Sequence, residues 1–318
     1  RREGGDASVK ALGAVTAVRR GAAAVTVTVH GKTAEALITV TADHPYDLVY
    51  HTFDGTSPSL WRLDIREAEE SPTRLVPDRE GAHVVPSPDG SRIAFVSGAP
   101  DAGIWVANAD GSDAREVVIG SRWSPVYQPA WSPDGTKIAY TRDIATGGGE
   151  QIWIVDVETK MTLATTDAHG TGHSWPTWSP VPIDGAYRIA YAQKIGSRSE
   201  IWSMREDFTD ARAVTQGNDR YDTQPAWSPD GQTIAFQRAT ISGFDIWLVD
   251  AEGGNELGLV GLDLAGEQST PRWSPDGKLV AFASKHETYG QATRLWQIYT
   301  LRATGGGLAR RTSGAVDK

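Results

Sequence analysis

The stretch Trp131-Ser132-Pro133-Asp134-Gly135 is followed by the short apolar run Ile138-Ala139-Tyr140. Nearly the same run returns at residues 227–236 and 273–282, and without its Trp at 87–95. Ser, Pro, Asp and Gly in this order suit a type I turn, because Pro presets φ at the second position and Gly is favoured at the fourth. A turn between two strand-type runs predicts a β-hairpin in every copy.

Two independent anchors measure the repeat. The Ser-Pro anchors at residues 87, 132, 179, 228 and 274 are separated by 45, 47, 49 and 46 residues. An aliphatic residue followed by Trp recurs at residues 60, 104, 152, 201, 246 and 295, with steps of 44, 48, 49, 45 and 49. Two motifs that keep one slowly changing period define six copies of one unit.

Each copy contains four short strand-type runs, which in one copy are residues 128–131, 138–142, 151–156 and 161–166. A period of 40 to 50 residues with four strands per unit is typical of a propeller blade. We therefore expect an all-β fold, a six-bladed β-propeller of four-stranded antiparallel blades.

The chain from about Tyr46 to Thr312 resembles the TolB-like six-bladed propellers with WD-like repeats. The repeat of that family reads Pro-x-Trp-Ser-Pro-Asp-Gly, Ile-Ala-Phe and Ile-Trp, found here at residues 225–231, 234–236 and 246–247. The resemblance implies a propeller over residues 42–318. It says little about function, because one fold serves many activities.

Composition limits the classes of partner. The net charge is −9 and the basic residues are scattered, so no basic patch for nucleic acid or an anionic membrane is expected. There is no 18-residue apolar run that could form a spanning helix, and cysteine is absent, which excludes a disulfide framework. Ten of the twelve Trp belong to the two repeat anchors, which predicts that they pack neighbouring blades together.

The N-terminal segment, residues 1–41, has a different pattern. Residues 14–18, 24–29 and 36–40 alternate small and β-branched residues, which predicts three strands. They resemble the last three strands of a bacterial Ig-like domain, of which the first half is missing. Since the chain begins at Arg1 without Met, we expect a mature or trimmed chain, and either a fragment of a longer surface protein or strands that complete the propeller.

The first blade lacks the Ser-Pro-Asp-Gly hairpin. In regular blades the Trp and the first aliphatic residue of the next strand are seven apart, and counting back seven from Leu48 gives Thr41. Residues 38–41 are therefore expected to pair with residues 48–51 as the inner strand. The rival donor is the C-terminus, but only six residues follow Thr312.

Three residues before the Trp column, on the expected inner strands, the repeats place a mixed polar and aromatic set. Its members are His83, Gln128, Trp175, Gln224 and Thr270, with His173 two residues before its fourth-blade member and Ile38 in blade one. Such a ring at a channel mouth could bind a peptide or a small polar ligand. The simpler interpretation is that these residues only line a water-filled channel.

Known catalytic patterns are not found. The run Gly172-His173-Ser174-Trp175-Pro176 lacks the closing Gly of a nucleophile elbow, and His286-Glu287 lacks the second His of a zinc helix. Oligogalacturonate lyases, which share the repeat, carry a His-rich metal site in the channel, where this chain offers only His83 and His173. A catalytic metal site usually needs about three protein ligands, so neither a metal nor a cofactor is expected.

Two classes of function remain. The first is a non-enzymatic, protein-binding scaffold, periplasmic or on the cell surface, that docks on an envelope or membrane-protein complex. The second is a metal-dependent polysaccharide lyase or another propeller hydrolase, which His or acidic residues converging in the channel would favour. We favour the scaffold; the irregular loops at residues 146–150, 181–184 and 253–266 are further candidate surfaces for partner-specific contacts.

Overall fold

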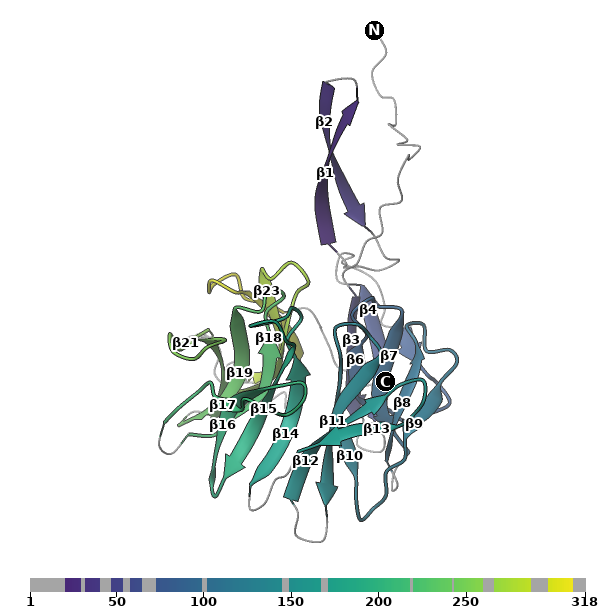
Figure 1. Cartoon of the computed structure of the whole chain (residues 1–318), viewed down its shortest axis with the longest axis vertical. Helices are drawn as coiled ribbons and strands as arrows, with labels where there is room; N and C mark the ends of the chain where they lie inside the picture. Colours follow the sequence, from purple (N-terminus) through teal and green to yellow (C-terminus); the bar gives the residue numbers. More distant parts are fainter. Residues whose placement is uncertain are drawn as a thin grey trace. The chain divides into compact units, whose positions relative to one another are not determined.

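The computed structural model describes residues 21–29, 32–40, 47–53, 58–64, 73–98, 102–144, 149–166, 171–217, 220–241, 243–259, 266–286 and 297–310. The chain divides into two compact units, residues 1–45 and 46–318. All regular structure in the described residues is β-strand (Figure 1). Within this part of the chain, no helix has the length and apolar composition that a membrane span requires.

The first unit contains one antiparallel hairpin. β1 (Gly21–Val29) pairs with β2 (Lys32–Val40) in continuous register from Gly21↔Val40 to Val29↔Lys32. The alternating β-branched residues therefore form two of the three expected strands, while residues 14–18 lie outside the described residues. The Ig-like assignment stays a prediction.

In the second unit the described residues form five four-stranded antiparallel blades and one three-stranded sheet, each in simple chain order. The three-stranded sheet is β3 (Asp47–Phe53), β4 (Pro58–Asp64) and β5 (Thr73–Leu75). The blades are β6 (Ala82–Pro86), β7 (Arg92–Ser97), β8 (Gly103–Asn108), β9 (Arg115–Val118); β10 (Val126–Trp131), β11 (Lys137–Ile144), β12 (Gly149–Asp156), β13 (Thr162–Thr165); β14 (Gly172–Trp178), β15 (Arg188–Ile195), β16 (Arg198–Arg205), β17 (Arg212–Ala213); β18 (Asp222–Trp227), β19 (Thr233–Thr240), β20 (Gly243–Asp250), β21 (Leu257–Gly258); and β22 (Gly266–Trp273), β23 (Leu279–His286), β24 (Gln297–Arg302), β25 (Ala309–Arg310).

One expectation is therefore wrong: among the described residues there are five complete four-stranded blades rather than six, because the sheet β3–β5 has three strands there. In the described residues Ile38 lies in β2 and pairs with Ala23, and β3 pairs with β4. That residues 38–41 supply the inner strand of the first blade stays a prediction, because residues 41–46 lie outside the described residues.

The Ser-Pro-Asp-Gly turns are confirmed in atomic detail. In the first of them the Ser87 hydroxyl donates to Asp89 Oδ1 at 2.6 Å and accepts from Arg92 N at 3.0 Å, while Gly90 N donates to Ser87 O at 2.8 Å. The same three bonds recur in the turns that begin at residues 132, 228 and 274. The closing glycines have φ between +68° and +72°, which favours glycine and explains the fourth residue of the motif.

These turns predict acid sensitivity. The Ser228 hydroxyl and the Gln232 N–H stabilise the Asp230 carboxylate, so the pKa of Asp230 is lowered below its ordinary value of 3.8. In Asp89, Asp134 and Asp276 burial on its own would raise the pKa of the carboxyl group. The hydrogen bonds to the carboxylate outweigh burial, so the pKa is again lowered. A lowered folded-state pKa contributes stability that is complete well above pH 3.8 and is lost as the pH falls through the folded-state value.

We therefore expect the melting temperature to fall steeply below about pH 4, as the four carboxylates take up protons. Asp230→Asn should lower stability at pH 7 but make the decline between pH 5 and pH 2.5 shallower, measured by thermal unfolding. Identical slopes for the variant and the natural chain would show that this turn does not contribute to the acid sensitivity.

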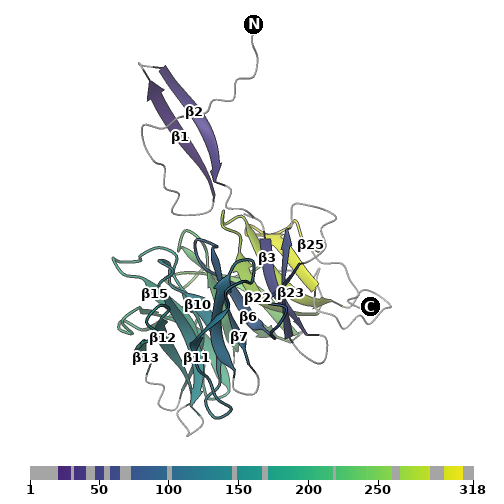
Figure 2. The ribbon, with the colours of Figure 1, turned by 90° about the vertical axis from the view of Figure 1, so that its right-hand side faces the viewer.

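The hydrophobic core lies between sheets rather than within them. Each of five clusters of buried residues combines side chains from two sheets that follow each other in the chain. The Trp column joins the sheets further, since the indole Nε1 groups of Trp131, Trp227 and Trp273 donate to Val85 O, Thr177 O and Ala226 O of the preceding blade at 3.0–3.2 Å. The expected packing role of these Trp residues is confirmed. Figure 2 shows the strands turned by 90° from the view of Figure 1.

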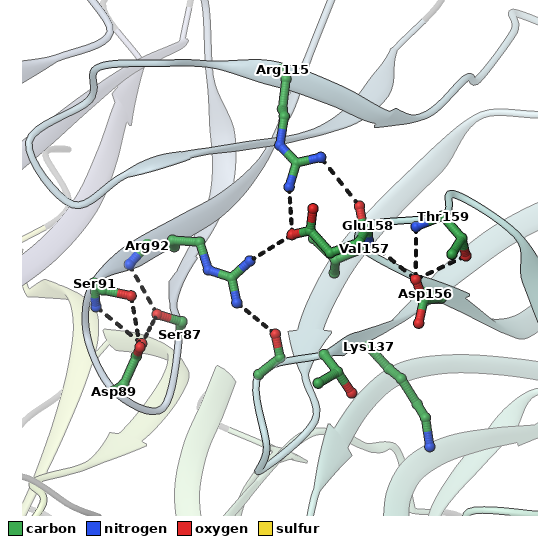
Figure 3. A network of polar contacts seen from close by, with 12 residues as sticks. Ser87, Asp89, Ser91, Arg92, Arg115, Lys137, Asp156, Val157, Glu158 and Thr159 are labelled. Atoms are coloured by element: carbon green, nitrogen blue, oxygen red, sulfur yellow. Dashed lines mark hydrogen bonds and ion pairs between the residues drawn. The ribbon is translucent and has the colours of Figure 1, made fainter.

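Polar contacts tie the blades together outside the core. Arg92, in the β6–β9 blade, donates to Gly135 O of the next blade at 2.7 Å (Figure 3). Arg92 also forms an ion pair with Glu158 Oε1 at 3.4 Å, and Arg115 forms a second ion pair with the same oxygen at 2.7 Å. A similar pair joins Arg212 and Glu252 two blades further along the chain. Exposed ion pairs contribute about 0–1 kcal/mol each, so this network adds less than the core.

Candidate functional site

The five inner strands share one irregularity, and it falls on the predicted ring. The register of each inner strand with its neighbour shifts at residues 82/85, 127/130, 174/177, 223/226 and 269/272. Between Tyr127 and Ala130 the inner strand advances three residues while its partner advances two, from Thr141 to Ala139. One extra residue in one strand is a β-bulge, a feature that re-aims side chains and is common next to binding sites.

Each ring residue occupies a bulge with a left-handed backbone. The φ angles of His83, Gln128, Trp175, Gln224 and Thr270 lie between +51° and +58°. Such angles cost about 1–3 kcal/mol in a non-glycine residue, so the surrounding structure must hold them. In four of the five strands a Pro follows, at residues 129, 176, 225 and 271, which fits because Pro has no N–H for the ladder.

Gln128 holds the bulge of the next blade. Its side-chain oxygen Oε1 accepts from the Thr141 hydroxyl at 2.7 Å and from Trp175 N at 2.8 Å. The Thr141 hydroxyl also lies 3.2 Å from Trp175 N and is fully buried. The backbone of Trp175 is thus satisfied by a side chain of the preceding blade, which locks the two inner strands together.

Gln224 repeats this arrangement two blades further along the chain, where its Oε1 accepts from Thr270 N in the last blade. Gln128 and Gln224 thus each join two neighbouring blades, a structural role beyond that of lining a channel. The remaining amide groups, Nε2 of Gln128 and of Gln224, have no partner within the described residues and can donate to a ligand.

Gln224→Ala should accordingly lower the free energy of unfolding by about 1–2 kcal/mol, because the Thr270 N–H loses its acceptor in a half-buried place. Urea denaturation would measure this. Gln232→Ala in the exposed turn of the same blade is the matched control and should stay within about 0.5 kcal/mol of the natural chain. Equal effects would contradict the role assigned to Gln224.

His83 and Trp175 meet although they come from blades that are not neighbours in the chain. Their rings are edge to face with centroids 5.9 Å apart, while the β10–β13 blade stands between β6 and β14 in chain order. Both side chains must therefore extend past β10 towards the centre of the ring of blades. Edge-to-face pairs of this kind contribute about 0.5–1.5 kcal/mol beyond area burial.

His173 has a different environment. It is buried, its ring lies edge to face with Tyr191 at 5.2 Å, and its Nε2 is 3.3 Å from the Thr171 hydroxyl. Ile38, the expected blade-one member, lies in β2 of the other unit. Among the described residues no group of three or more His, Cys, Asp or Glu side chains could hold a metal ion.

Sequence reasoning missed a buried charge network at the start of β18. Arg238 and Asp222, which are 4% and 1% exposed, form a bidentate pair at 2.7 Å, and Glu256 joins Arg238 at 2.6 Å. Although burial alone would lower the pKa of Arg238, its bonds to Asp222 and Glu256 raise it. Arg220 completes the network by contacting Glu256 at 2.6 Å. No motif identifies this network, because the residues that form its ion pairs are 16 or more positions apart in the sequence. Which of them face each other depends on strand register.

Comparison with known proteins gives one family and several relatives. A family profile described as "TolB beta propeller domain" matches residues 42–263. The "Tol-Pal system protein TolB" of Methylococcus capsulatus is 31% identical over 114 residues, covering 30% of this chain and 24% of that protein. The match thus spans about a quarter of the relative.

Solved structures share the fold. The putative TolB from Agrobacterium tumefaciens is 20% identical, with a TM-score of 0.58 over 77% of this chain and 91% of that one. An oligogalacturonate lyase in complex with manganese is 15% identical, with a TM-score of 0.57 over 91% of this chain and 84% of that one. Because the putative TolB and the lyase match equally well, structural likeness describes the fold alone.

Proposed function

Because the chain belongs to the TolB beta propeller domain family, we propose that it is a non-enzymatic protein-binding scaffold outside the cytoplasm. In this proposal it works in the periplasm or at the cell surface, as a subunit that docks on an envelope or membrane-protein complex. Relatives named Tol-Pal system protein TolB support that setting. No nucleic acid or cofactor is part of the proposal.

The observation that carries the proposal is the edge-to-face contact between His83 and Trp175, whose ring centroids are 5.9 Å apart. An aromatic pair supplies apolar contact area, and the Nε2 groups of Gln128 and Gln224 supply two donors for peptide carbonyl oxygens. The bulges and the bonds between blades hold these groups before a ligand arrives, which reduces the entropy lost on binding. The site is therefore suited to an extended peptide segment of a partner protein.

A photo-crosslinking experiment tests this proposal. A benzophenone amino acid would replace Trp175 in cells that make the natural full-length protein, and its control would replace Ile241, which is fully exposed on a turn between β19 and β20. We expect a protein adduct at position 175 that His83→Ala weakens, and none at position 241. Adducts at position 241 alone would indicate that the partner binds the outer loops. Metal-dependent cleavage of polygalacturonate that His83→Ala abolishes would indicate a lyase rather than a scaffold.

A further inference from the structure

The Trp column is covered unequally from one pair of blades to the next. Trp131, Trp178 and Trp227 are 6–7% exposed, whereas Trp273 is half-buried. The Trp273 indole nevertheless donates to the preceding blade at 3.0 Å, as those of Trp131 and Trp227 do at 3.2 Å. Trp273 therefore has the same place between two blades as its counterparts but a less complete cover.

The cover of Trp131 is an arginine of the preceding blade. The guanidinium carbon of Arg92 lies 4.8 Å from the centre of the Trp131 ring. Its Nη2 donates to Gly135 O at 2.7 Å, and its Nη1 lies 3.4 Å from Glu158 Oε1 (Figure 3). A cation over an indole is attracted by the negative face of the ring. Arg92 thus fills the seam between the β6–β9 and β10–β13 blades with a stacked, hydrogen-bonded guanidinium.

The next two seams are covered by other side chains. Lys137 stands in the second seam where Arg92 stands in the first, and its Nζ lies 3.6 Å from Glu206 Oε2 of the following blade. In the third seam Ile183, from the long turn of the β14–β17 blade, packs against the cluster that contains Trp227. Each of these seams therefore contains a side chain that extends from the preceding blade.

Thr233 stands in the last seam, between the β18–β21 and β22–β25 blades, where Arg92 stands in the first. The N–H of each residue donates to the hydroxyl of the Ser that opens its turn, at 2.9 Å for Thr233 and 3.0 Å for Arg92. A threonine side chain is too short to extend over the indole of Trp273. The stacked cation of the first seam is therefore missing here.

Thr304 likewise stands where the first seam has Glu158. The residues before them, Ala303 and Val157, each donate their N–H at 2.9 Å to the carbonyl oxygen of the residue after the Gly of the turn, which fixes the correspondence. The last seam thus contains two threonines in place of an arginine and the glutamate that binds it.

A cleft of about 480 Å³ occupies this last seam. Trp273 and Leu248 supply apolar lining, and Asp230 and Gly277 supply polar lining. Asp230 Oδ1 is engaged within its own turn, but Oδ2 accepts no hydrogen bond from any other described residue. The carbonyl oxygen of Gly277, which corresponds to that of Gly135, also has no donor in the described part of the chain. The acceptors of the first seam are thus repeated without their donor.

The charge of the cleft favours a cation. No Lys or Arg is among the described residues that line it, while Asp230 and Asp276 both are. Asp276 has a partner in Lys278 at 3.5 Å, so Asp230 is the carboxylate that is left to pair with a ligand. The net charge of the chain, −9, also favours association with a basic protein surface.

We propose that this cleft binds an arginine side chain of a partner protein, whose guanidinium stacks on Trp273 and donates to Gly277 O and the Asp230 carboxylate. The partner's arginine makes between two chains the contacts that Arg92 makes within this one. Arginine suits the place better than lysine, because a guanidinium is planar and weakly hydrated and can donate to two acceptors while it stacks. The proposal rests on the scaffold function for the nature of the partner, but it uses a surface separate from the His83–Trp175 contact.

An NMR titration of the full chain tests the proposal, with ¹⁵N-labelled Trp side chains and the Trp273 indole signal assigned through Trp273→Phe. The probes are acetyl-Gly-Arg-Gly-amide and its counterparts with Lys and with citrulline, which has nearly the shape of arginine without its charge. We expect the arginine peptide to shift the Trp273 signal saturably, with a Kd on the order of 1 mM. The lysine peptide should bind about threefold more weakly or worse, and the citrulline peptide should have no effect at the same concentration.

Thr233→Arg should fill the cleft from within this chain, as an arginine does in the first seam. We expect a higher melting temperature, a shift of the Trp273 signal in the direction that the peptide causes, and loss of the peptide's effect. Gln216→Arg makes a similar charge change at an exposed position after β17. This matched control should bind the arginine peptide as the natural chain does.

Asp230→Asn should weaken binding of the arginine peptide by about fivefold or more, because the guanidinium loses its charged acceptor. Asp134→Asn makes the same change in the turn of a seam that Arg92 already fills, and it should leave the Kd of the peptide unchanged. The pair of variants separates the contact with the ligand from the effect of the carboxylate on its own turn.

Three results would overturn the proposal. A Trp273 signal that does not move with the arginine peptide would show that the cleft does not accept a guanidinium. Equal binding of the arginine and citrulline peptides would show that charge is not recognised. Unchanged peptide binding by Thr233→Arg would place the site elsewhere. Loss of crosslinking at position 175 with intact binding of the arginine peptide would refute only the ring, so the two proposals fail separately.

Discussion

Asp222→Ala is expected to lower the free energy of unfolding by about 3–5 kcal/mol, because it leaves the buried Arg238 guanidinium without the carboxylate that it contacts at 2.7 Å. Glu256 keeps one contact with Arg238, but it also binds the exposed Arg220 and cannot replace the bidentate pair. Denaturant titration would measure the loss.

Two further variants make this prediction sharp. Glu252→Ala removes a surface pair of similar length, in which the carboxylate is 57% exposed, and should cost no more than about 1 kcal/mol. The double variant Asp222→Ala/Arg238→Met removes both charges and should be more stable than Asp222→Ala alone. A double variant less stable than the single one would show that the pair is not what stabilises this corner of the blade.

Trp227→Ala should lower the free energy of unfolding by about 3–5 kcal/mol, because it leaves a cavity in a core that two blades share. The indole is 7% exposed, and its Nε1 donates to Thr177 O of the preceding blade at 3.2 Å, so the substitution removes both packing and a hydrogen bond between blades. Thermal and denaturant unfolding would both report the change.

The chain contains its own control for this variant. Trp123 precedes Ser124 and Pro125 in a copy of the motif that lacks Asp-Gly, and its side chain is 71% exposed. Trp123→Ala should therefore change stability by no more than about 0.5 kcal/mol. Comparable losses at 123 and 227 would contradict the assignment of the Trp column to packing between blades.

Local chemistry made much of this protein predictable. The Ser-Pro-Asp-Gly turns form as expected because Ser, Asp and Gly satisfy each other's hydrogen bonds within six residues. The Trp column packs between blades because a large apolar side chain at a fixed position in each repeat must be buried. Counting from that column identifies the ring residues, and the Pro residues that follow four of them indicate the bulge.

Other features depended on contacts between segments far apart in the sequence. The left-handed backbone at Gln128 and Gln224, the pairing of Asp222 with Arg238, and the three-stranded sheet β3–β5 follow from register and from competition between possible strand partners. The sequence by itself determined the repeat, its turns and its all-β class, since these arise within a few residues. Only the tertiary structure decided which strands complete a blade and which polar groups meet, because those depend on the summed free energy of distant pairings.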